Sequence, residues 1–317
     1  MIEIIFLGTS ASAPSVHRGL SAQVVMYKDY RFLVDCGEGT QRQILQSGLG
    51  FKRLNKILLT HSHLDHILGL GGLISTFARW ETIDHVTIYG GIWALERVRD
   101  LLYGVVLRGG EVQIKIDLIE VQPGTVLEDD TFEIVAFPVI HRGPCLGYLF
   151  REKPRRPFIN ERAEALGVPR GPERRRLVAG ESVVLADGRV IYPDDVLGPP
   201  QQGASLAFVG DAGRVDNLVE AVRGVDMLVI EATYLRAEAE MARRFGHLTA
   251  AQAARLALDA EVHRLVLTHV SRRYHEAQIL EEARAIFPDT LVARDFDYYR
   301  VLRRNVTSGT LLPETEE

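Results

Sequence analysis

The sequence predicts a mixed α/β fold in which helices cover a layered core of strands. Strand-like and helix-like stretches alternate along most of the chain, and 317 residues with 46% hydrophobic and 25% charged residues can bury a sizeable core. One long segment, residues 151–203, breaks the alternation. We therefore expect one large domain that carries an appendage.

The expected strands are short apolar runs bounded by turn residues. In chain order they are Glu3–Gly8, Gln23–Tyr27, Tyr30–Val34, Lys56–Thr60, Val86–Tyr89, Phe132–Phe137, Gly147–Phe150, Ser205–Val209, Met227–Glu231 and Arg264–Thr268. Apolar residues at helical spacing predict helices at Thr40–Ser47, Trp93–Leu102, Val215–Val222, Thr249–Asp259 and Glu276–Ile286. The glycines of Gly69–Gly72 predict a turn.

The segment 151–203 is rich in Pro, Gly and Arg and has only two strand-like pieces, Ser182–Leu185 and Arg189–Tyr192. Such a segment is a functional insertion or a disordered stretch, and we interpret it as an arm. The core is then formed by residues 1–150 and 204–307, with a C-terminal tail at 308–317. The alternative is a long surface loop without a role.

Charge is unevenly placed along the chain. The whole sequence has a formal net charge of −5, yet the stretch from Arg151 to Arg176 holds nine Arg or Lys and four Glu. A basic segment on an acidic body predicts an anionic partner that binds at one place.

Composition also indicates the compartment. No run approaches the roughly 18–20 apolar residues of a membrane-spanning helix, and the N-terminus begins with an expected strand instead of a signal sequence. The two cysteines, Cys36 and Cys145, cannot form a disulfide framework, so we interpret them as buried small residues. We expect a soluble cytoplasmic protein without a membrane partner.

The strongest chemical signal is Thr60-His61-Ser62-His63-Leu64-Asp65-His66, which follows an apolar strand. Four potential ligands within six residues converge only if the chain leaves the regular strand, for example in a loop that leads into a helix. A polar surface turn has little reason to collect three histidines and an aspartate. This cluster predicts a metal site.

One loop cannot complete the coordination of two metal ions, so further ligands must come from other strand ends. His141, Asp211 and His269 each lie just past an expected apolar strand, where layered α/β folds place their sites. Each alone is more often an ordinary polar strand end, but their joint pattern favours a shared site.

These residues, in this order, resemble the signature of the metallo-β-lactamase superfamily. The resemblance implies an αβ/βα four-layer sandwich, here with a protruding arm. It also implies two Zn²⁺ ions per subunit, with Mn²⁺ or Mg²⁺ as substitutes in vitro. His61, His63 and His141 would bind one ion and Asp65, His66 and His269 the other, with Asp211 bridging both.

Further motifs resemble the ribonuclease Z family. They are Phe6-Leu7-Gly8-Thr9-Ser10, Asp35-Cys36-Gly37-Glu38-Gly39-Thr40, Glu231-Ala232-Thr233, Gly246-His247-Leu248-Thr249 and Thr268-His269-Val270-Ser271-Arg272-Arg273-Tyr274. The resemblance implies a zinc-dependent endoribonuclease that removes the 3′ trailer of precursor tRNA. The tRNA would keep a 3′-OH and the trailer a 5′-phosphate.

The same resemblance suggests catalytic roles. Asp65 would accept the proton of the attacking water, and His247, oriented by Glu231, would contact the phosphate or assist the leaving 3′ oxygen. Without the resemblance, His247 is more simply a residue preceding the helix cap Thr249.

Four positions depart from the family pattern. Ile230 stands where His is common, Leu248 where Ser is common, Ala212 where Thr is usual, and Gly19 where Asn is common. The first three departures are expected to touch the surroundings of the metals and the phosphate.

The arm also resembles a family feature, an exosite that grips the tRNA, through its segment Leu166–Pro172. Its expected tRNA-binding residues are Arg155, Arg156, Arg170, Arg174, Arg175 and Arg176. Family enzymes are homodimers, so a homodimer is expected. Two alternatives remain: a hydrolase of small phosphodiesters, lactones or thioesters, and an inactive RNA-binding relative.

Overall fold

Two seven-stranded sheets form the centre of the protein in the computed structural model, which describes residues 1–80, 83–109 and 114–303. The first sheet has the order β16 (Tyr298–Val301), β1 (Ile2–Gly8), β2 (Ala22–Tyr27), β3 (Tyr30–Val34), β4 (Lys56–Leu58), β5 (His85–Gly90), β6 (Lys115–Glu120). The second has the order β15 (Thr290–Val292), β14 (Arg264–Thr268), β13 (Met227–Glu231), β12 (Ser205–Phe208), β9 (Pro144–Glu152), β8 (Phe132–Ile140), β7 (Gly124–Glu128).

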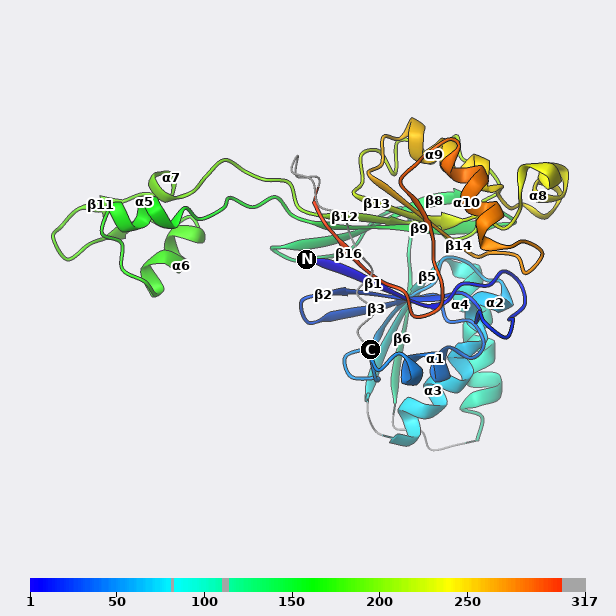
Figure 1. Cartoon of the computed structure of the whole chain (residues 1–317). Helices are drawn as coiled ribbons and strands as arrows, with labels where there is room; N and C mark the ends of the chain where they lie inside the picture. The colour runs from blue at the N-terminus through cyan, green and yellow to red at the C-terminus, as the bar shows by residue number, and fades with distance from the viewer. Residues whose placement is uncertain (81–82, 110–113, 304–317) are drawn as a thin grey trace. The chain divides into compact units, whose positions relative to one another are not determined.

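Helices cover the outer face of each sheet (Figure 1). The first sheet carries α1 (Thr40–Gln46), α2 (Leu64–Ile67), α3 (Gly69–Trp80), α4 (Ile92–Leu101) and a π-helical turn at Leu102–Val106. The second carries α9 (Ala250–Asp259) and α10 (Glu276–Arg284). A 3₁₀ turn at Arg236–Glu238 and α8 (Ala239–Phe245) precede α9. The predicted αβ/βα four-layer sandwich is confirmed.

Three hydrophobic clusters separate the four layers, and β1 shows how the sequence builds them. Ile4 and Phe6 lie in the cluster between the sheets, whereas Ile5 and Leu7 lie in the cluster under α1, α3 and α4. Successive side chains of a strand point to opposite faces, so a strand covered on both sides must be apolar on both. The third cluster packs α9 and α10 on the second sheet.

Some element predictions were wrong. Val215–Val222 forms a series of turns and not a helix, although Leu218 and Val222 are buried as the helical spacing implied. Gly69–Gly72 lies inside α3 and is not a turn. A Cβ at Gly69 would lie 2.0 Å from the carbonyl oxygen of Gly37, so glycine here lets the helix approach the neighbouring backbone.

The chain divides into two compact units, residues Met1–Arg151 with Ala204–Glu317 and residues Glu152–Gly203. The second unit, called the arm from here on, is inserted between β9 and β12. It contains α5 (Asn160–Ala165), α6 (Pro172–Val178), α7 (Pro193–Val196) and a hairpin of β10 (Val183–Val184) and β11 (Val190–Ile191). The hairpin matches the two predicted strand pieces, but the sequence did not predict the helices.

The arm has a hydrophobic core of its own. Its buried residues are Ala163, Val168, Leu177, Val183, Ile191, Val196 and Leu197. The tail predicted at 308–317 lies outside the described residues. Among the described helices, none is long and apolar enough to cross a membrane. Cys36 and Cys145 are both buried and both free.

Candidate metal centre

The predicted metal ligands all follow the carboxyl ends of strands. The chain leaves β4 and reaches the loop His61–His66, whose last part begins α2. His141 follows β8, Asp211 follows β12 and His269 follows β14. Parallel strands end at the same edge of a sheet, which is why residues so distant in sequence can meet there.

Four of these residues form a first cluster. The Nδ1 atom of His63 lies 2.9 Å from Nε2 of His61 and 3.3 Å from Nε2 of His141. Oδ2 of Asp211 lies 3.7 Å from Nε2 of His61 and 4.0 Å from Nε2 of His141. Three imidazoles and one carboxylate thus direct one atom each toward a common point.

A second cluster lies on the other side of Asp211. Oδ2 of Asp65 is 3.8 Å from Nε2 of His66 and 3.4 Å from Nε2 of His269. The Asp211 carboxylate places Oδ2 3.5 Å from Nε2 of His66 and Oδ1 3.4 Å from Nδ1 of His269. The Asp211 carboxylate therefore lies within 4.0 Å of histidines of both clusters.

A buried aspartate, Asp35, sets the tautomers of His66 and His61. Asp35 accepts hydrogen bonds from Nδ1 of His66 at 2.7 Å and from the Thr60 hydroxyl at 2.8 Å. Because the Thr60 hydroxyl gives its hydrogen to Asp35, it accepts from Nδ1 of His61 at 3.0 Å. Both imidazoles thus carry a proton on Nδ1 and direct Nε2 toward the centre.

Two further histidines are oriented in the same way. Nδ1 of His141 donates to the carbonyl oxygen of Gly246, which can only accept. The Thr233 hydroxyl donates to Glu231 at 2.6 Å and accepts from Nδ1 of His269 at 3.0 Å. Histidine ligands of metals characteristically donate their outer N–H to a carboxylate or carbonyl in this manner.

Two buried polar atoms at the centre of the site have no hydrogen-bond partner among the described residues, and a bound cation would satisfy them. Nε2 of His66 and Oδ1 of Asp211 are buried without a hydrogen-bond partner, an arrangement that costs free energy unless another group satisfies them. Burial opposes a charge on His66, but Asp211 and Asp35 raise its pKa well above the ordinary value. The carboxylates that favour a positive charge on His66 also favour a metal cation at its Nε2, so the residues fit a pair of imidazole- and carboxylate-bound ions.

His247 lies beside the metal ligands but is bound to Glu231. Its Nδ1 donates to Oε1 of Glu231 at 2.9 Å and lies 3.9 Å from Oδ2 of Asp211. Burial opposes the charged form, yet Glu231 raises the pKa of His247 to about 9. Glu231 therefore favours the protonated form of His247.

Glu231 is fully buried and organises the surrounding backbone. Besides His247 and Thr233, it accepts the backbone N–H of Ala212 at 2.8 Å and that of Leu248 at 3.1 Å. Four donors match the acceptor capacity of one carboxylate, so each oxygen is satisfied. Thr249, two residues after His247, caps α9, so this loop both carries His247 and begins the helix.

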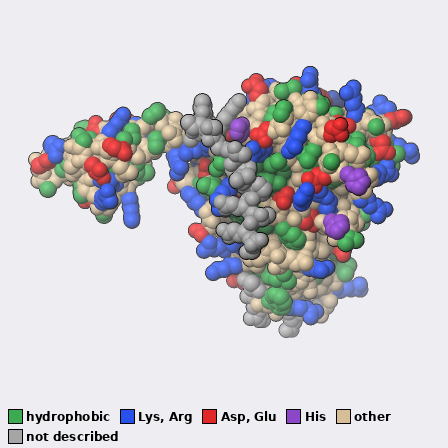
Figure 2. Space-filling model, in the orientation of Figure 1, with side chains coloured by type: hydrophobic (Ala, Val, Ile, Leu, Met, Phe, Trp, Pro, Cys, Tyr) green, Lys and Arg blue, Asp and Glu red, His purple; other side chains and the backbone are tan. Residues whose placement is uncertain are grey.

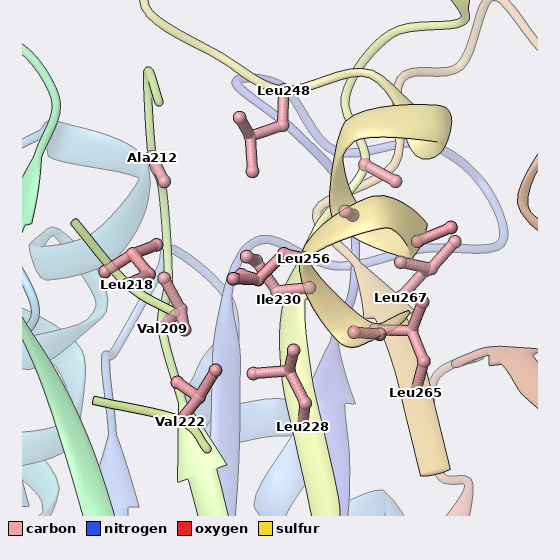
Figure 3. Packing of buried hydrophobic residues seen from close by; sticks show 14 of the residues in the cluster. Val209, Ala212, Leu218, Val222, Leu228, Ile230, Leu248, Leu256, Leu265 and Leu267 are labelled. Atoms are coloured by element: carbon pink, nitrogen blue, oxygen red, sulfur yellow. The ribbon is translucent and has the colours of Figure 1, made fainter. Parts of the chain in front are cut away.

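Three of the four positions that depart from the family pattern lie near the site and are buried. Ala212, Ile230 and Leu248 are fully buried in the hydrophobic cluster under α9 and α10 (Figure 3). The backbone N–H groups of Ala212 and Leu248 contact Glu231, the carboxylate that also holds His247 and Thr233. Their side chains, like that of Ile230, belong to the hydrophobic cluster.

The six arm arginines differ in how firmly the arm holds them. Arg156 donates to the carbonyl oxygens of Gly198 and Leu197 and pairs with Asp194, and Arg174 donates to the Val168 carbonyl oxygen. These two side chains are part of the arm's structure. The side chains of Arg155, Arg170, Arg175 and Arg176 are exposed, and Figure 2 shows arginines and carboxylates mixed on the arm surface.

Sequence reasoning gave no role to three residues that orient the histidines. Asp35, Thr60 and Thr233 hold the outer nitrogens of His66, His61 and His269. Asp35 has φ of +56°, a left-handed conformation that is uncommon outside glycine and frequent at functional sites. A polar residue directly after an apolar strand was the available signal, because Asp35 follows β3 as Asp211 follows β12.

Comparison with known proteins defines the class. Residues 196–270 match the family described as "Beta-lactamase superfamily domain", and residues 2–139 match "Anti-Pycsar protein Apyc1". The metallo-β-lactamase fold protein YhfI from Bacillus subtilis superposes with a TM-score of 0.68 at 18% identity, over 94% of this chain and 98% of that one. Four layers and this ligand set define a protein of the metallo-β-lactamase fold.

More specific relatives identify the family. Ribonuclease Z from Bradyrhizobium sp. (strain ORS 278) is 48% identical over 94% of this chain and 99% of the relative. Ribonuclease Z from Archaeoglobus fulgidus is 37% identical over 93% and 96%. The short form of human tRNase Z superposes with a TM-score of 0.66 at 25% identity, over 95% and 99%. The chain belongs to the ribonuclease Z family.

Proposed function

We propose that this protein is an endoribonuclease that cuts precursor tRNA to remove its 3′ trailer. The convergence of seven side chains on two clusters joined by Asp211 carries the proposal, together with membership of the ribonuclease Z family. The scissile bond is the phosphodiester that joins the tRNA to its trailer. Its cleavage would leave a 3′-OH on the tRNA and a 5′-phosphate on the trailer.

Zn²⁺ is the cofactor that this donor set favours. His61, His63, His141 and Asp211 would hold one ion, and Asp65, His66, His269 and Asp211 a second. Mn²⁺ or Mg²⁺ would substitute in vitro at the carboxylate-rich positions. When bound, such a pair of cations polarises the phosphodiester and lowers the pKa of the attacking water.

The proton transfers are assigned to two side chains. Asp65 is 15% exposed, and the backbone N–H of Ser12 donates to its Oδ2 at 3.0 Å, so the carboxylate is held at the open side of the centre, where it accepts the proton of the water. His247, which Glu231 holds through Nδ1, would donate a proton to the leaving 3′ oxygen. Glu231 is a positioning residue, because it holds the ring of His247 through Nδ1.

The arm is proposed as a tRNA-binding exosite. Its exposed arginines, Arg155, Arg170, Arg175 and Arg176, would contact phosphates of the folded tRNA without reading its sequence. Arg170 and Arg176 already pair with Glu164 and Glu181, so Arg155 and Arg175 are the better candidates.

A homodimer and a cytoplasmic location complete the proposal. Large apolar side chains are exposed at Leu64 in α2, at Leu68 directly after it, and at Tyr103 and Val105 on the π-helical turn. Exposed apolar residues of this kind support an interface between two copies. Analytical ultracentrifugation at micromolar concentration would give the mass of a dimer, and a concentration-independent monomer would contradict it.

Incubation of the purified protein with a precursor tRNA tests the activity. The expected result is one cut at the trailer junction in the presence of Zn²⁺, Mn²⁺ or Mg²⁺, with ends mapped as 3′-OH and 5′-phosphate. Absence of cleavage with all three ions would refute the proposal. Hydrolysis of small phosphodiesters, lactones or thioesters under the same conditions would then favour a small-molecule hydrolase, and tRNA binding alone an inactive relative.

A further inference from the structure

Helix α4 contacts both loops that carry the histidines of the first metal cluster. Trp93 and Arg97 lie four residues apart, so they share one face of the helix. Arg97 donates to the carbonyl oxygen of Ser62, which stands between His61 and His63. Trp93 packs on Gly143, two residues after His141.

In the loop after His141, the backbone of Gly143 lies against the indole ring of Trp93. Gly143 has φ of +143°, and a Cβ built on it would lie 2.7 Å from Cζ3 of Trp93. No side chain other than hydrogen fits between this backbone and the ring. The indole is therefore held against the ligand-bearing loop by packing.

Trp93 nevertheless remains 52% exposed. One part of the ring rests on the loop while much of it faces solvent, an unusual state for a side chain with so large an apolar area. The loop on which Trp93 packs also carries an arginine, since Arg142 precedes Gly143 and has its guanidinium 5.5 Å from the ring centre of Phe245. Exposed aromatic rings among arginines are the composition of sites that bind single-stranded nucleic acid.

We propose that Trp93 is a stacking platform for a nucleobase next to the scissile phosphate and thereby positions the single-stranded 3′ segment of the substrate. This inference rests on the proposed endonuclease function and adds a residue that determines where the RNA lies. It follows from the contact with Gly143, which places the ring within two residues of a metal ligand. Stacking needs only the flat face of a base, so it would serve precursors with different trailers.

Steady-state cleavage of precursor tRNA by Trp93 variants is the first test. Trp93→Ala should lower kcat/KM about ten-fold, the loss typical for one base stack, mainly through KM. Trp93→Phe should retain activity within about three-fold because it keeps a flat ring. Trp80→Ala is the matched control: Trp80 is the other tryptophan, 60% exposed at the end of α3, and its loss should change nothing.

Abasic substrates locate the base and separate stacking from a general defect. Precursors would carry an abasic nucleotide at one position at a time, from the last tRNA nucleotide to the second trailer nucleotide. At one position the wild-type rate should fall about ten-fold, and there Trp93→Ala and wild type should become equal. A loss in Trp93→Ala that persists undiminished on every abasic substrate overturns the proposal.

Tryptophan fluorescence gives a readout independent of turnover. In Trp80→Phe, Trp93 is the remaining tryptophan, and its emission should be quenched when precursor tRNA binds; in Trp93→Phe, the emission of Trp80 should stay unchanged. Absence of quenching refutes stacking. An altered sedimentation coefficient in Trp93→Ala, without coupling to any base, would assign Trp93 to a contact between copies of the chain and overturn the proposal.

The outcomes for the two claims are distinguishable. If wild-type protein does not cut any precursor tRNA, the proposed function fails. If wild type cuts and Trp93→Ala cuts equally well with an equal metal content, only the stacking role fails.

Discussion

The metal centre collects seven aspartate and histidine side chains on loops and at the start of α2 in the four-layer core. Most of them are buried, with His66 and Asp211 almost inaccessible to solvent. In the arm, Arg170 is 84% exposed and pairs with a half-exposed glutamate. Both regions concentrate charge, but burial makes each polar atom of the first depend on a specific partner. The exposed charges of the second are screened by water and salt, so each contributes little alone.

This difference predicts that single substitutions act strongly at the centre and weakly on the arm. The centre has a hydrogen-bond network in which Asp35 and Glu231 each hold several donors. The arm distributes its proposed binding over several arginines that act additively. We expect substitutions of the metal ligands to cause the largest losses of activity on precursor tRNA. Substitutions of the buried groups around them should cause smaller losses, and single substitutions on the arm the smallest. Any other ranking would contradict this difference between the two regions.

Asp65→Asn should have the largest effect. The substitution removes the proposed proton acceptor and one ligand charge, so kcat on precursor tRNA should fall about 10³-fold or more. Binding of tRNA, measured by fluorescence anisotropy, should change little because the arm is intact. The exposed Asp29→Asn serves as control, and an Asp65→Asn enzyme with more than a tenth of the wild-type kcat would contradict the assignment.

Leu248→Ala should destabilise the core beneath the centre. Leu248 is fully buried in the cluster under α9 and α10, so removal of its side chain leaves a cavity and should cost about 2–5 kcal/mol of unfolding free energy in urea titrations. Leu258→Ala, on the exposed side of α9, should change it by less than about 0.5 kcal/mol. Equal effects of the two variants would show that the cluster is not a tightly packed core.

Glu231→Gln should reduce activity by an intermediate factor. The amide keeps the size of the side chain but replaces one acceptor oxygen by a donor, so it cannot serve both pairs of donors around it. Loss of such an orienting partner typically costs about 10- to 100-fold in activity or metal affinity. Glu261→Gln, exposed at the end of α9, is the control. An unchanged kcat would remove Glu231 from the mechanism.

Arm variants should show the smallest single effects. Arg155→Ala and Arg175→Ala should each raise the KM for precursor tRNA a few-fold, and the slope of log affinity against log salt should fall by about one per lost phosphate contact. Their kcat should stay near wild type. Arg255→Ala on α9 is a matched exposed arginine of the other unit. If the double variant binds tRNA as wild type does, the exosite proposal fails.

The two regions also differ in how far the sequence predicted them. The positions of His61–His66, His141, Asp211 and His269 followed from polar residues placed after apolar strands, a signal that depends on local sequence. The resemblance to a known superfamily supplied how they divide into two clusters. Sequence reasoning missed the orienting roles of Thr60 and Thr233, because a hydroxyl that relays a hydrogen bond is recognised only when its three-dimensional partners are known.

The arm was harder to predict because its elements are short. α5, α6 and α7 have between four and seven residues each, too few for a helical period to stand out. The prediction for Gly69–Gly72 failed for a different reason: glycine is a common turn signal, whereas in this chain it permits close packing of α3 on Gly37. Distant contacts of this kind leave no trace in the local pattern.

Metal stoichiometry of the purified protein tests the central claim most directly. Inductively coupled plasma mass spectrometry should find two Zn²⁺ ions per chain after saturation and dialysis, and Asp211→Ala, which removes the residue shared by both clusters, should lose both. Less than one ion per wild-type chain, or two ions retained in Asp211→Ala, would contradict a two-ion centre joined by Asp211.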